Sequence, residues 1–114
     1  MKLIDQTLHC VVADRLRIAK NFWERLVGLL GTRSMAPGEG LWLPKCQGIH
    51  TFGMAFSIDV IFLDRTGKAV RIAGHVAPNR TGPVEMTADG VIELPEGTLD
   101  RFLIQEGDLL EISD

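Results

Sequence analysis

The stretch Leu41–Asp64, LWLPKCQGIHTFGMAFSIDVIFLD, decides the fold because its second half has the pattern of a strong β-strand. Side chains point alternately to the two faces of a strand, so residues two apart share a face. Ile61 and Leu63 are apolar on one face, which predicts a strand buried on both sides in its second half. The other face is apolar along the whole segment 54–63: Met54, Phe56, Ile58, Val60 and Phe62.

Two turn signals predict antiparallel hairpins. The segment 64–67, Asp-Arg-Thr-Gly, has a glycine where positive φ is expected, so residues 68–73 should return antiparallel. The segment 88–90, Ala-Asp-Gly, predicts a second hairpin between strands at 84–87 and 91–94. Four further strands are expected at 8–13, 18–19, 41–43 and 109–112.

Helix signals occur in two places. The capping box Asn21–Glu24 predicts a main helix at about 22–30, with the cap followed by apolar residues at helical spacing. A short helix is predicted at about 98–103, with Thr98 as its cap. The segment 76–83, which contains proline and glycine, is expected to be a loop.

The composition limits the class of protein. A chain of 114 residues has the length of a single domain, residues 1–114, that buries roughly two-thirds of its unfolded surface. Its hydrophobic share of 46% and charged share of 24% are ordinary for a globular protein. Because hairpins join most strands, we predict a β-dominated α+β fold: an antiparallel β-sandwich or small barrel with one main helix and one short helix.

Charge and hydropathy exclude two kinds of partner. The net charge is −3 without a basic cluster, so no nucleic-acid partner is expected. Apolar runs are only a few residues long, and polar residues interrupt the N-terminal segment MKLIDQTLHCVVADR, where a signal-peptide core would lie. We therefore expect no membrane partner and a small soluble protein of the cytoplasm, where Cys10 and Cys46 stay reduced.

Polar side chains inside the apolar stretch 41–64 predict a site. Burying polar groups costs free energy unless they are hydrogen-bonded. We expect Asp59 to accept hydrogen bonds from a neighbouring loop or to pair with Arg25 or Arg33. The candidate ligand-binding residues are Cys46, His50, Thr51, Met54, Asp59, Arg25 and Arg33.

The same residues leave two kinds of chemistry open. Cys46, His50 and Met54 are spaced four apart and form a soft ligand set suited to copper. Four residues of a strand span about 13 Å, so a shared ion would need a tight bend of the chain at a glycine. In the second case His50 activates the Cys46 thiol and Asp59 orients the imidazole. The structural interpretation is that Cys46 and Met54 simply fill the core.

Five segments follow one another in a specific order: RLVGLLGTRSM at 25–35, C-x-x-x-H-T-F-x-M at 46–54, IDVIFLD at 58–64, VIELPEGTL at 91–99 and EGDLLEI at 106–112. In these segments, which extend over nearly the whole chain, the sequence resembles the family called domain of unknown function 192. This family occurs in bacteria and archaea. The resemblance implies a single compact β-rich domain without an established enzyme activity.

The resemblance also bears on the site. It maps Arg25, Thr51 and Asp59 onto positions shared by the family. Many members have a Trp-Met-Lys-Asn-Thr type motif where this chain has Gly48-Ile49-His50-Thr51, which places it in a His-Thr variant. Many members also carry a signal peptide or a membrane anchor, which this sequence is not expected to have.

Together, these patterns favour a non-catalytic accessory protein that binds a small ligand or a protein partner and uses no cofactor. We expect a monomer or a weak homodimer. The alternatives are a thiol-dependent enzyme using Cys46 and His50, a copper-like metal-binding protein using these two residues and Met54, and a structural module whose exposed apolar surface docks another protein.

Overall fold

A computed structural model describes residues 1–21, 24, 29 and 33–114 of the chain. The described chain is rich in β-strands and contains one short helix. The strands are β1 (Lys2–Asp5), β2 (Cys10–Ala13), β3 (Arg15–Ile18), β4 (Glu39–Pro44), β5 (Gly48–His50), β6 (Ile58–Leu63), β7 (Ala69–Val76), β8 (Thr81–Val84), β9 (Gly90–Pro95) and β10 (Leu110–Ser113), and the helix is α2 (Thr98–Phe102).

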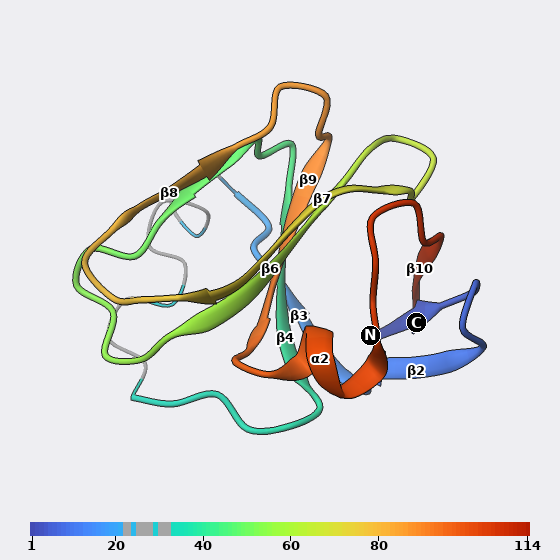
Figure 1. Ribbon diagram of the computed structural model, residues 1–114, viewed down its shortest axis with the longest axis horizontal. Coiled ribbons are helices and arrows are strands. Elements are labelled where there is room, and N and C mark those ends of the chain that lie inside the picture. The colour runs from blue at the N-terminus through green and yellow to red at the C-terminus, as the bar shows by residue number, and fades with distance from the viewer. Residues whose placement is uncertain (22–23, 25–28, 30–32) are drawn as a thin grey trace.

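The described strands form three sheets. The central sheet has the order β3-β4-β9-β6-β7, a second sheet has the order β10-β1-β2, and β5 pairs with β8 in a two-stranded ribbon. Figure 1 shows the ribbon at one side of the molecule and the three-stranded sheet, with both chain ends, at the other. None of the described sheets closes into a barrel. The predicted β-dominated α+β class is therefore confirmed, in its open, layered form.

One strand pair departs from the predicted antiparallel pattern. β3 and β4 run parallel, with Arg15 opposite Glu39 and Ile18 opposite Trp42. A parallel pair needs a crossover of a dozen or more residues. The chain between β3 and β4 is long enough to provide one.

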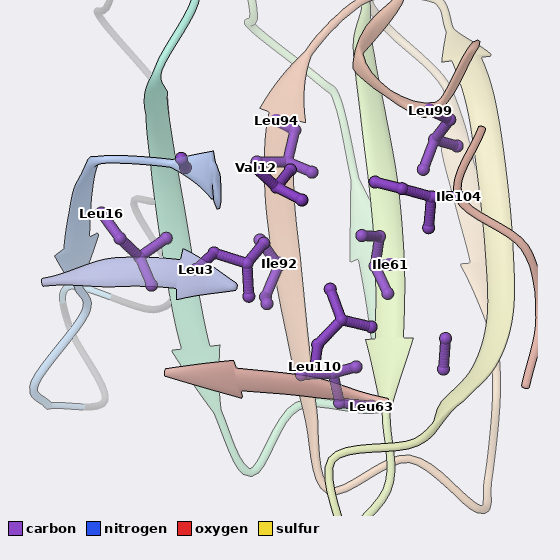
Figure 2. Packing of buried hydrophobic residues seen from close by; sticks show 12 residues of the cluster. Leu3, Val12, Leu16, Ile61, Leu63, Ile92, Leu94, Leu99, Ile104 and Leu110 are labelled. Atoms are coloured by element: carbon purple, nitrogen blue, oxygen red, sulfur yellow. The ribbon is translucent and has the colours of Figure 1, made fainter. Parts of the chain in front are cut away.

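The first hydrophobic cluster lies between the three-stranded sheet and one face of the central sheet. Figure 2 shows Leu3 of β1 and Val12 of β2 lying against Ile92 and Leu94 of β9, with Ile61 of β6 beside them. Side chains from α2 and β10 belong to the same cluster. Two sheets packed across a shared core are the arrangement of a β-sandwich.

The second hydrophobic cluster covers the opposite face of the central sheet. Ile58, Val60 and Phe62 of β6 belong to it, whereas Ile61 and Leu63 belong to the first cluster. All six residues of β6 are buried. The prediction of a strand with two buried faces is thus confirmed, because the central sheet has a core on each side.

The predicted main helix at 22–30 lies outside the described residues except for Glu24 and Leu29. The described part of its capping box is formed as expected: the side-chain oxygen of Asn21 accepts a hydrogen bond from the backbone N–H of Glu24 at 2.9 Å. The Glu24 carboxylate in turn accepts a bond from the backbone N–H of Lys20. Leu29 is buried in the second cluster.

The short helix is confirmed at Thr98–Phe102, but Thr98 is not its cap. The N-cap residue is Gly97, whose φ of 93° a glycine adopts easily. The Thr98 hydroxyl instead donates a hydrogen bond to the carbonyl of Pro95 at 2.6 Å. The N–H groups at the start of α2 are bonded by a side chain from a distant strand, as described below.

The central strand begins later than predicted. β6 starts at Ile58, because the chain turns just before it: Gly53 has a φ of 80° and the N–H of Met54 donates to the carbonyl of Thr51 at 3.1 Å. Met54 nevertheless belongs to the second cluster with Ile58. The prediction that Met54 packs on the same side as Ile58 is therefore correct, and the predicted start of the strand at Met54 is wrong.

The predicted loop at 76–83 is shorter than predicted and occupies only residues 77–80, because β7 extends to Val76 and β8 occupies residues 81–84. Pro83 fits there since a ribbon of two strands has an unpaired edge, where a missing N–H costs nothing. A Cβ on Gly82 would lie 2.9 Å from the carbonyl oxygen of Ile49. Gly82 therefore allows β5 and β8 to approach closely and does not mark a loop.

The predicted second hairpin at 84–94 does not form. The strand β9 pairs with β4 and β6 instead of with the segment 84–87. Gly90 is buried directly against the indole ring of Trp42, where any Cβ would overlap the ring. Gly90 is thus required by its close packing against Trp42, although a glycine in this sequence context is also typical of a turn.

Candidate functional site

Thr51, one of the predicted site residues, is fully buried and densely hydrogen-bonded. Its hydroxyl donates to the carbonyl of Ala77 at 2.6 Å and accepts from the N–H of Arg80 at 2.9 Å. Its backbone N–H donates to the carbonyl of Arg80 at 2.8 Å, and its carbonyl accepts from the N–H of Asn79 at 2.8 Å. Thr51 therefore fastens the loop 77–80 to the end of β5.

We expect the substitution Thr51→Val to lower the free energy of unfolding by about 2 kcal/mol. Valine has the same shape but leaves the carbonyl of Ala77 and the N–H of Arg80 without their side-chain partner, and each such loss costs about 1 kcal/mol or more. Urea unfolding measures the change. The matched control is Thr87→Val at an exposed threonine, which should change stability by less than about 0.5 kcal/mol. Equal effects of the two substitutions would contradict the role of Thr51.

Two rings lie on either side of this lock and face outward. His50 and Phe52 are both exposed, Phe52 to 50%, and their rings stack with centroids 5.9 Å apart. Residues 50 and 52 share a face while 51 points inward, as expected of an extended chain. Val84 lies opposite Gly48 in the ribbon and is 57% exposed, and Met86, just after β8, is 71% exposed. We call His50, Phe52, Val84 and Met86 the outer ribbon surface.

The two sulfur-containing candidates lie on the inner side. Met54 is 6% exposed and belongs to the second cluster, and Cys46 is half-buried and packs against the same cluster. His50 is exposed and stacked on Phe52. These positions agree with the core-filling interpretation of Met54.

Asp59 lies on the other face of the central sheet. Along β6, Asp59 points to the same face as Ile61 and Leu63, two residues of the first cluster. Its side chain is 1% exposed. One oxygen of its carboxylate accepts a bond from the N–H of His75 at 2.9 Å. The other accepts from the N–H groups of Gly97 at 3.0 Å and Leu99 at 2.9 Å.

The Asp59 carboxylate therefore joins three elements: β6, which carries it, the end of β7, and the start of α2. It supplies the side-chain cap that α2 lacks in its own sequence. The predicted bonding to a neighbouring loop is what the structure shows, with backbone N–H groups as donors. Of the two arginines proposed as its partners, Arg33 is exposed and Arg25 lies outside the described residues.

The predicted site is thus divided between two faces. The structure brings Cys46, Thr51 and Met54 to the side of the second cluster and its ribbon, with His50 at the outer surface. Asp59 lies across the central sheet from them, beside α2. Within the described part of the chain, no three His, Cys, Asp or Glu side chains lie close enough to hold a metal ion.

Three buried acids, Glu93, Asp5 and Asp108, were not predicted from the sequence. Glu93 of β9 is 5% exposed, and its Oε2 atom has no hydrogen-bond partner. Burial raises the pKa of the Glu93 carboxyl to about 7. The signal was its place in Val-Ile-Glu-Leu, where the alternation of a strand buried on both sides puts the glutamate into a core.

Asp5 at the end of β1 is the second such acid and is fully buried. Its Oδ1 accepts a bond from the N–H of Leu8 at 2.9 Å. Burial and the neighbouring carboxyl of Asp108 raise the pKa of Asp5 to about 6. Burial, with these two acids nearby, also raises the pKa of the Cys10 thiol. The strand β1 itself was not predicted, so nothing in the sequence marked Asp5 as buried.

The layered sheets and the buried polar locks define a small β-dominated α+β domain built around a central sheet with a core on each face. The chain belongs to the DUF192 family (Uncharacterized ACR), whose model matches residues 4–112. The resemblance seen in the sequence is therefore confirmed. No helix in the described part of the chain is long and apolar enough to cross a bilayer.

A relative agrees with this assignment, and two solved structures share the fold. The chain is 33% identical over 113 residues to a UPF0127 protein of Thermococcus sibiricus. The match covers 96% of this chain and 73% of that protein. A protein of unknown function from Novosphingobium aromaticivorans has the same fold, with a TM-score of 0.86 and 21% identity over 98% of this chain and 84% of that one. A putative transcription regulator from Sinorhizobium meliloti gives a TM-score of 0.83 and 23% identity over 96% and 89% of the two chains.

Proposed function

We propose that this protein is a non-catalytic binding domain that docks a protein partner on its outer ribbon surface. The observation that carries the proposal is the arrangement around Thr51. A buried polar lock holds the base of the ribbon, while the stacked rings of His50 and Phe52 lie exposed beside it. Rings whose backbone is fixed lose little entropy when a partner binds.

The composition of the outer ribbon surface supports a protein partner. Aromatic residues and methionine are enriched at protein–protein interfaces, where a few such side chains carry most of the binding energy. Phe52, Val84 and Met86 are each at least half exposed. Large apolar side chains gathered on one exposed surface are typical of an interaction site.

The contact proposed is between side chains and does not add a strand to the ribbon. The free edge of β8 carries Pro83, which has no N–H to donate to an incoming strand. Proline on an edge strand is a common protection against strand addition. Specificity would then come from the two rings and from Val84 and Met86.

The partner is proposed to be a protein and not a nucleic acid. A transcription regulator, as the Sinorhizobium meliloti relative is described, needs a basic surface to bind DNA, whereas this chain has a net charge of −3. We place the protein in the cytoplasm, as a monomer or weak homodimer.

Photo-crosslinking tests this proposal. A benzoyl-phenylalanine replacing Phe52 in cells of the source organism should give one discrete adduct, because the ring lies at the centre of the proposed interface. Mass spectrometry of the adduct distinguishes a protein from a small molecule. Adding Met86→Asp should remove the adduct, since a charge in an apolar contact costs binding energy.

The matched control places the same crosslinker at Leu103, which is 72% exposed and lies after α2. No adduct of the same mass is expected there. Unfolding midpoints of the Phe52 and Met86 variants should equal that of the wild type, because both side chains are exposed. Equal crosslinking from positions 52 and 103, or an adduct insensitive to Met86→Asp, would overturn the proposal.

A further inference from the structure

A groove on the far side of the molecule from the ribbon has features of a separate binding site. It lies between β2, the turn before β4 and α2, and has a volume of about 330 Å³. Ligand sites in proteins begin at about this size. Val11 and Phe102 give it an apolar part, and Asp14, Arg15 and Arg101 give it a charged part.

The guanidinium of Arg101 is the group best placed to meet a ligand. It lies over the ring of Phe102, with Cζ 5.1 Å from the ring centroid. Among the ion pairs of the described residues, none includes Arg101. The neighbouring carboxylate of Asp100 is directed to the ring of His75 instead, at 3.4 Å. The groove therefore contains an oriented positive charge without an acidic partner.

The second guanidinium, that of Arg15, is a fixed part of the wall. Its Nη2 donates to the carbonyl of Pro37 at 2.6 Å, and its Nε lies 3.5 Å from Oδ1 of Asp14. The turn approaches this pair closely at Gly38: a Cβ there would lie 2.6 Å from the same Asp14 oxygen, and its φ is +91°. With Asp14 offsetting one of the two arginines, the groove has a net charge of +1.

We propose that this groove binds a carboxylate group attached to an apolar body. A guanidinium matches a carboxylate in planar, bidentate geometry. The net charge of +1 suits a monoanion, whereas Asp14 would repel a dianion such as phosphate. Val11 and Phe102 would cover the apolar body. This site is independent of the outer ribbon surface and does not rest on the function proposed for it.

An NMR titration with phenylacetate tests the proposal on ¹⁵N-labelled protein. The amide signals of Val11, Gly38 and Phe102 should shift and saturate, with a dissociation constant of about 1–10 mM for a ligand of this size. Phenylacetamide, which has the same shape without the charge, should cause no saturable shift. Arg101→Gln should weaken phenylacetate binding about tenfold or more, because a charge-assisted hydrogen bond is lost.

The matched control is Arg65→Gln in the exposed turn after β6, which should leave the affinity unchanged. Glutamine is a good helix former, so the Arg101 variant keeps α2. The proposal is overturned if phenylacetamide binds as tightly as phenylacetate, if Arg101→Gln binds phenylacetate like the wild type, or if inorganic phosphate shifts the same signals at lower concentration.

A further experiment distinguishes whether the carboxylate comes from the C-terminus of a polypeptide or from a small organic acid. The peptide acetyl-Ala-Ala-Phe is compared with its C-terminal amide in the same titration. Tighter binding of the free acid than of phenylacetate would assign the groove to the C-terminus of a polypeptide. Weaker binding would assign it to a small organic acid, and both results support a carboxylate site provided that the amide does not bind.

Discussion

Asp59→Ala is expected to lower the free energy of unfolding by about 4 kcal/mol. The carboxylate accepts bonds from the backbone N–H groups of His75, Gly97 and Leu99, and alanine leaves all three without this partner. Each buried donor left unpaired costs about 1–3 kcal/mol. Urea unfolding at neutral pH measures the loss, and hydrogen exchange should show that the protection of α2 falls first.

Two variants separate the charge from the shape of the Asp59 side chain. Asp59→Asn keeps one acceptor oxygen but points an NH₂ group at backbone donors, so a loss of about 2 kcal/mol is expected. Asp89→Ala removes the side chain of an exposed aspartate and should cost less than about 0.5 kcal/mol. If Asp59→Ala also cost less than that, Asp59 would not be the lock between β6, β7 and α2.

Glu93→Gln is expected to stabilise the protein, and increasingly so as the pH rises. Glu93 lies between Leu41 and Val60 on neighbouring strands, in the face that packs on the second cluster. Burial raises the pKa of its carboxyl from 4.5 to about 7. Between these two values the folded state holds a proton that the unfolded state has released, so the stability of the wild type falls with rising pH.

The size of this effect follows from the same shift. Glutamine does not titrate, so the gap in unfolding free energy between variant and wild type should widen by about 3 kcal/mol from pH 4.5 to pH 7. Above about pH 7 the gap should stay constant. Urea midpoints across pH 4–8 measure it, with Glu85→Gln as the control glutamate. A gap that does not change with pH would show that Glu93 is ionised within the fold at low cost.

Several elements followed directly from local sequence. The alternation after Met54 predicted the strand with two buried faces, and the turn at 64–67 predicted the β6–β7 hairpin. The Asn21–Glu24 capping box is present in its described part. In each case the determining interactions join residues close in the chain, so their spacing is enough to reveal them.

The predictions that read Gly82, Pro83 and Gly90 as turn or loop signals failed, in contrast to the turn predicted from Gly67. Gly82 and Gly90 are required by close contact with Ile49 and with Trp42, residues that lie far away in the sequence. Pro83 is tolerated because its strand has a free edge. A missing side chain can serve either a turn or a tight contact, and only the pairing of strands tells them apart.

The pattern of residues along the chain was enough to predict a β-dominated domain, with Met54 and Asp59 in or beside its core. Contacts between distant segments make Asp59 the cap of a helix some forty residues away. They also leave His50 and Phe52 facing outward and bring Arg101 together with Arg15 and Phe102 in one groove. Periodicity along a strand fixes which face of that strand a side chain takes. Which element covers that face depends on long-range packing, and the local sequence does not encode it.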